Sequence, residues 1–99
     1  MKHYDPVVCT DGFTMSVQAG KGLYCSPRVD DAPAYREVEV RGSDELFEKY
    51  SNDRGDYADY EDPDPTEYVL AYMPVEVVAA VIAKHGGLKS GEVPPGVDH

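Results

Sequence analysis

Residues 7–18, which read VVCTDGFTMSVQ, indicate the class of fold. Val7-Val8-Cys9 is a short apolar run, and the pair Asp11-Gly12 that follows it is a strong turn signal. From Phe13 to Gln18 apolar and polar side chains alternate without exception, as in a strand with one buried face. The stretch therefore predicts a β-hairpin, with Phe13, Met15 and Val17 facing inward.

Further elements follow along the chain. Residues 35–40 (YREVEV) also predict an alternating strand, in which a bulge offsets Tyr35. Residues 67–72 (EYVLAY) have the aromatic and branched content of a buried strand. A short helix is expected over 43–50, and Pro74 suits the first turn of a longer helix over 75–85 that stops at Gly86-Gly87. We expect one α+β domain over residues 1–87: an antiparallel sheet of about four strands with one main C-terminal helix packed on it. Residues 88–99 are expected to form a disordered tail.

The longer predicted helix is apolar on every side except at Glu76, Lys84 and His85. One small sheet covers only one face of such a helix, so the remaining apolar surface needs another partner. This pattern predicts a homodimer seam that contains Val77 and Val81.

Net charge is the most unusual property of the composition. Nineteen Asp and Glu residues stand against nine Lys and Arg residues among 99, which gives a formal charge of −10. An acidic protein is unsuited to binding nucleic acid directly through phosphates or to docking on anionic membranes. It favours proteins with basic surfaces as partners. Without a secretory signal or an apolar run of about 20 residues, the chain is expected to be cytoplasmic.

Residues able to carry catalysis or bind a metal are few. Cys9 and Cys25 are the only cysteines. We expect them to be buried, unreactive thiols. The alternatives are a disulfide between them or zinc binding together with two of the three histidines. The spacing lacks the close ligand pairs of structural zinc sites. A calcium loop starting at Asp53 is excluded, because its sixth position is Ala58 and its twelfth is Asp64. We expect no enzyme activity, no metal and no cofactor.

The acidic segment 51–65 is the strongest candidate for a binding surface. In an extended chain, carboxylates on alternate residues stand about 6.6 Å apart, comparable with successive phosphates along a nucleic-acid strand. Interleaved tyrosines add surfaces suited to stacking. The alternative is a solvated loop that only keeps the protein soluble. The expected partner-binding residues are Asp53, Asp56, Tyr57, Asp59, Tyr60, Glu61, Asp62, Asp64 and Glu67.

Two parts of the chain, DGFTMSVQA (11–19) with YCSPR (24–28), and MPVEVV (73–78) through HGG (85–87), resemble small proteins of tailed bacteriophages and prophages. The resemblance does not extend to the acidic segment and assigns no functional residue. A phage setting implies an inhibitor of host defence, most concretely an anti-CRISPR protein that blocks DNA binding by a Cas effector. The alternative function is that of a small phage structural or assembly protein that oligomerises through the apolar helix.

Overall fold

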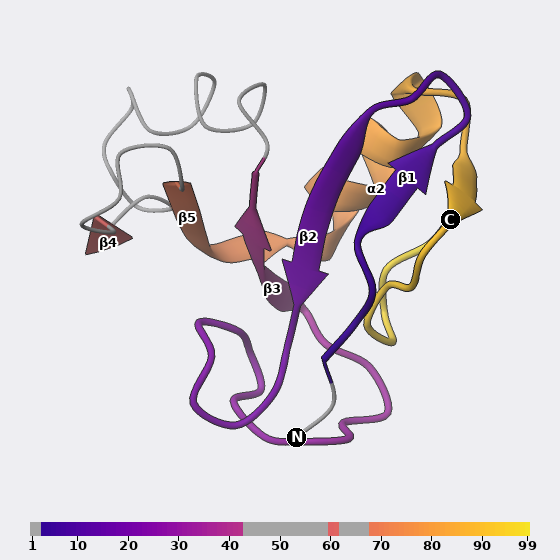
Figure 1. The fold of residues 1–99 in the computed structure, drawn as a ribbon. Helices are drawn as coiled ribbons and strands as arrows, with labels where there is room; N and C mark the ends of the chain where they lie inside the picture. The colour runs from indigo at the N-terminus through magenta and orange to yellow at the C-terminus, as the bar shows by residue number, and fades with distance from the viewer. Residues whose placement is uncertain (1–2, 43–59, 62–67) are drawn as a thin grey trace.

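The computed structural model describes residues 3–42, 60–61 and 68–99 (Figure 1). This part of the chain contains strands β1 (Val7–Cys9), β2 (Thr14–Gln18), β3 (Glu37–Arg41), β4 (Tyr60–Glu61), β5 (Tyr68–Pro74) and β6 (Leu88–Ser90). Its one helix is α2 (Val75–Lys84). All neighbouring strands are antiparallel, in the order β4-β5-β3-β2-β1-β6. The predicted α+β class is confirmed, while the predicted helix over 43–50 lies outside the described residues.

The predicted hairpin is present as β1 and β2, with Val7 opposite Met15. The Cys9 N–H donates to the Phe13 carbonyl at 2.8 Å, and the Gly12 N–H donates to the Cys9 carbonyl at 2.9 Å. Gly12 has a φ of 96°, a backbone conformation that favours glycine. The turn chemistry of the sequence therefore sets the register of the hairpin. Phe13 itself precedes β2 and is only partly buried.

One face of the sheet and one side of α2 enclose the main core. Met15 and Val17 of β2 are buried together with Val38 and Val40 of β3. These side chains alternate with polar ones along both strands, as a two-sided sheet requires. The contribution of α2 to the same cluster consists of Val75, Val78, Val81 and Ile82.

The two residues of the predicted homodimer seam, Val77 and Val81, lie on the side of α2 that faces the core. Val81 is buried within the core of the single chain, and Val77 packs against the same core while partly buried. The outward positions of α2 include Glu76, Ala80 and Ala83. Because alanines rather than valines occupy this outer surface, the helix leaves much less apolar area to cover than its sequence alone indicates.

Residues 88–99 differ from the predicted disordered tail. Leu88–Ser90 forms β6 and pairs with β1, with Val8 opposite Ser90. Farther on, the Tyr35 N–H donates to the Pro95 carbonyl at 2.8 Å, and Val97 is only 5% exposed. The segment is poor in regular structure but rich in contacts, because the chain folds back along β1 and onto the loop before β3 (Figure 1).

Candidate functional site

The acidic part of the chain connects two neighbouring strands. We call residues 43–67 the acidic connection. β3, which ends just before it, and β5, which begins just after it, are paired so that Arg41 lies opposite Val69. The two strand ends that flank the acidic connection are therefore neighbours in the sheet (Figure 1).

Most of the charge of the protein lies in this connection. Ten of the nineteen acidic residues but only two of the nine basic ones fall between positions 43 and 67, so this segment carries −8 of the formal −10. The remaining 74 residues carry only −2. The sheet and helix are thus nearly neutral, and the acidity of the protein is a local property of one connection.

Two of the predicted partner-binding residues, Tyr60 and Glu61, lie in the described part of the connection. They form β4, which pairs with β5 so that Tyr60 lies opposite Val69 and Glu61 opposite Tyr68. β4 thus places part of the acidic connection at the end of the sheet order. The other predicted residues lie outside the described residues: Asp53, Asp56, Tyr57, Asp59, Asp62, Asp64 and Glu67.

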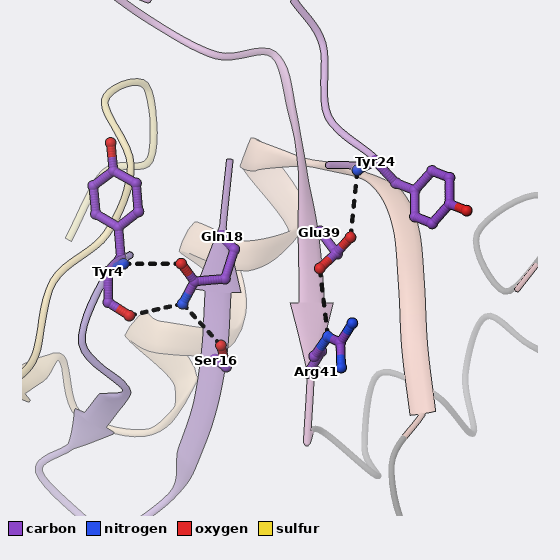
Figure 2. A network of polar contacts seen from close by, with 6 residues as sticks. All are labelled: Tyr4, Ser16, Gln18, Tyr24, Glu39 and Arg41. Atoms are coloured by element: carbon purple, nitrogen blue, oxygen red, sulfur yellow. Dashed lines mark hydrogen bonds and ion pairs between the residues drawn. The ribbon is translucent and has the colours of Figure 1, made fainter. Parts of the chain in front are cut away.

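The face of the sheet opposite the main core carries polar side chains (Figure 2). On β2, the Gln18 amide accepts a hydrogen bond from the Tyr4 N–H at 2.9 Å and donates to the Tyr4 carbonyl at 2.7 Å. It also donates to the Ser16 hydroxyl at 2.9 Å. A side chain only 5% exposed thus ties the N-terminal segment to the sheet and satisfies both backbone groups of Tyr4.

Glu39 lies opposite Gln18 on this polar face and is only 3% exposed. Its carboxylate accepts a hydrogen bond from the Tyr24 N–H at 3.3 Å and pairs with the Arg41 Nε at 3.4 Å. The alternation of residues 35–40 does not predict burial of this carboxylate. It is buried because the segment before β3 returns across the sheet and places the backbone of Tyr24 on it (Figure 2).

A bulge in β5 provides the second backbone hydrogen bond that holds Tyr24 on the sheet. Val38 and Val40 are two residues apart on β3, but their partners Met73 and Leu70 are three apart on β5. The extra residue allows the Tyr72 N–H to donate to the Tyr24 carbonyl at 3.1 Å. Tyr72 has a φ of 54°, which is unfavourable for a residue with a bulky side chain.

The bulge brings two tyrosine rings together. Tyr24 and Tyr72 meet edge to face, with ring centroids 5.9 Å apart and an interplanar angle of 62°. The guanidinium carbon of Arg28 lies 5.5 Å from the centroid of the Tyr24 ring, within cation–π range. Both tyrosines are partly exposed and Arg28 is exposed. We call these three residues the tyrosine cluster. Sequence reasoning missed it because its members come from the loop between β2 and β3 and from the bulge in β5.

A second polar contact joins the hairpin turn to the end of α2. The Asp11 carboxylate accepts hydrogen bonds from the Phe13 N–H at 3.0 Å and from the His85 Nδ1 at 2.7 Å. The His85 ring also stacks on Phe13, with centroids 4.0 Å apart. The Phe13 hydrogen bond, followed by that of His85, lowers the pKa of Asp11 below its usual range. His85, predicted at the C-terminal end of the helix, is the C-cap of α2 and connects the helix to the hairpin through Asp11 and Phe13.

Neither cysteine forms a disulfide, and both are buried. Burial raises the pKa of both thiols above the usual value, which favours the unreactive protonated form. Within residues 3–42, 60–61 and 68–99, no group of three or more His, Cys, Asp or Glu side chains is placed to hold a metal ion. Over the same residues, no helix has the length and apolar character to cross a membrane.

No family model, curated protein or solved structure matches this chain.

Proposed function

We propose that the protein is a binding protein, not an enzyme, whose acidic connection occupies a basic nucleic-acid-binding surface on another protein. The observation that carries this proposal is the concentration of charge: −8 of the formal −10 lies between two strand ends that are hydrogen-bonded neighbours. A solubilising charge has no need to be gathered in one connection. The negative charge concentrated in the acidic connection produces a strong local electrostatic field beside a nearly neutral sheet and helix.

The mechanism is competition for cations. Proteins that bind nucleic acid neutralise phosphates with lysine and arginine, and carboxylates at similar spacing pair with the same side chains. Complementary charge also speeds association, so an acidic competitor reaches a basic channel rapidly at low salt. The residues in contact with the partner are those predicted from the sequence, with Tyr57 and Tyr60 as aromatic anchors.

The partner that we propose is a Cas effector complex, which makes the protein an anti-CRISPR protein acting in the bacterial cytoplasm. Support for this partner comes from the resemblance of residues 11–19 and 24–28, and of 73–78 through 85–87, to small phage proteins. The alternative role in phage assembly relied on a large apolar surface of the helix. That role loses its main support, because Val75, Val78, Val81 and Ile82 face the core of the single chain.

Charge reversal at matched positions tests the proposal. One variant carries Asp59→Lys, Asp62→Lys and Asp64→Lys in the acidic connection. The control carries Asp5→Lys, Glu76→Lys and Asp98→Lys at exposed sites outside it. Each variant changes the formal charge from −10 to −4. We expect only the first to lose inhibition of DNA binding by the effector, with both folded by circular dichroism. Equal inhibition by the two variants would show that the position of the charge is irrelevant.

A further inference from the structure

We propose that the tyrosine cluster, Tyr24, Tyr72 and Arg28, is a second contact surface, which receives arginine side chains from the basic partner. This inference rests on the proposed function, since it takes the partner to be a protein rich in cations. It adds a specific chemistry to that function: recognition of guanidinium groups by aromatic rings beside the bulge in β5.

The backbone at Tyr72 is the first argument. A non-glycine residue at a φ of 54° is energetically unfavourable, and asparagine or glycine fits this conformation better. Strained residues persist where the surrounding structure holds them, and they are frequent at binding sites. The ring of Tyr72 is partly exposed and lies outside the main core. A tyrosine here is therefore better explained by a role of its ring than by the needs of the fold.

The backbone of Tyr24 is held in place by hydrogen bonds, which is the second argument. The Tyr24 N–H donates to the buried Glu39 carboxylate, and the Tyr24 carbonyl accepts from the Tyr72 N–H. Both backbone groups of Tyr24 are thus held on the sheet while its ring is directed away from Glu39 (Figure 2). Rings fixed in this way lose little conformational entropy on binding, and tyrosine is among the residues enriched at interface hot spots.

The position of the cluster is the third argument. Tyr72 lies three residues along β5 from Val69, the partner of Tyr60 in β4. At ~3.3 Å per residue, the cluster is about 10 Å along the strand from the pairing that fixes the acidic connection. One basic surface is wide enough to contact both. Arg28, placed over the Tyr24 ring at 5.5 Å, shows the geometry by which these rings accept a guanidinium group.

Two peptides separate this contact from charge attraction in general. Deca-arginine and deca-lysine carry the same charge, but only guanidinium groups combine stacking with cation–π attraction on aromatic rings. We expect the full-length protein to bind deca-arginine about two- to fivefold more tightly than deca-lysine, the range for one exposed cation–π contact. Binding is measured by isothermal titration calorimetry at fixed salt.

Variants assign the preference to the cluster. Tyr72→Gly removes one ring and relieves the strained φ, while Tyr24→Leu removes the other ring and keeps both backbone hydrogen bonds. Asp31→Gly is the matched control, because Asp31 has nearly the same φ, 55°, in an exposed loop. We expect both tyrosine variants to bind the two peptides equally, because the loss of a ring weakens deca-arginine more than deca-lysine, and the control to keep the preference.

The outcomes distinguish this inference from the proposed function. Binding of both peptides without any preference, or a preference that survives in both tyrosine variants, would overturn the role of the cluster and leave the acidic connection as the binding element. Binding of neither peptide would overturn both. Should one tyrosine variant fail to fold by circular dichroism, the other still decides the question.

Discussion

The substitution Val97→Ala tests most sharply whether the C-terminal segment packs against the core. Val97 is 5% exposed and belongs to the main core cluster, although it lies only two residues from the end of the chain. Val97→Ala removes two methyl groups, each contributing about 0.8 kcal/mol when buried, and leaves a small cavity. The expected loss in free energy of unfolding is about 1.5–2.5 kcal/mol. A disordered tail would give no loss.

Val29→Ala is the matched control, because Val29 is the same residue type and is 49% exposed. Its expected effect is within about 0.5 kcal/mol of the wild type. The assay is urea unfolding followed by far-ultraviolet circular dichroism, with tyrosine fluorescence as a second probe, since the chain has eight tyrosines and no tryptophan. A loss below about 0.5 kcal/mol for Val97→Ala at an unchanged m-value would refute the docking of this segment.

Three further predictions concern other contacts of the described residues. Gln18→Leu removes the hydrogen bonds of the Gln18 amide to the Tyr4 N–H and carbonyl. At ~1–3 kcal/mol for each lost buried hydrogen bond, the variant is expected to lose about 2–6 kcal/mol in urea unfolding, and a change below about 0.5 kcal/mol would contradict the network. Because the folded-state pKa of Asp11 is lowered, its contribution to stability is present above the ordinary aspartate pKa of about 4 and is lost as the pH falls through the lower folded value. Asp11→Asn should therefore be less stable than the wild type at pH 7, with a gap in unfolding midpoint that closes in acid; a gap independent of pH would show that the carboxylate charge is irrelevant. Both thiols should react with a disulfide reagent at pH 8 only in denaturant, since they are buried with a raised pKa; rapid reaction of the native protein would contradict their burial.

The parts of the fold that follow from local chemistry were predictable from the sequence. The hairpin of β1 and β2 depends on the Asp11-Gly12 turn and on alternation over a few residues, and α2 depends on Pro74 and Gly86-Gly87. β6 was not predictable, because Leu88–Ser90 is short and its partner β1 lies about 80 residues earlier. The burial of Val97 was not predictable for the same reason, because the segment around it contacts Tyr35, about 60 residues earlier.

The candidate site divides in the same way. Clustered carboxylates are visible in the sequence, which therefore predicts a binding surface over residues 51–65, but the pairing of the strands that flank this segment is not visible. The tyrosine cluster was not visible, since it requires the bulge that gives Tyr72 its positive φ and the loop that places Tyr24 over Glu39. Neither a bulge nor a loop path has a strong periodic signal.

Competition with DNA is the most direct test of the central claim that the acidic connection occupies a nucleic-acid-binding surface. A fluorescent DNA duplex bound to a Cas effector is titrated with the full-length protein, and anisotropy is followed at low and at high salt. We expect release of the DNA, at a protein concentration that rises steeply with salt because the contacts are ionic. Binding of the protein to the effector with the DNA still bound, or release that is independent of salt, would contradict this claim.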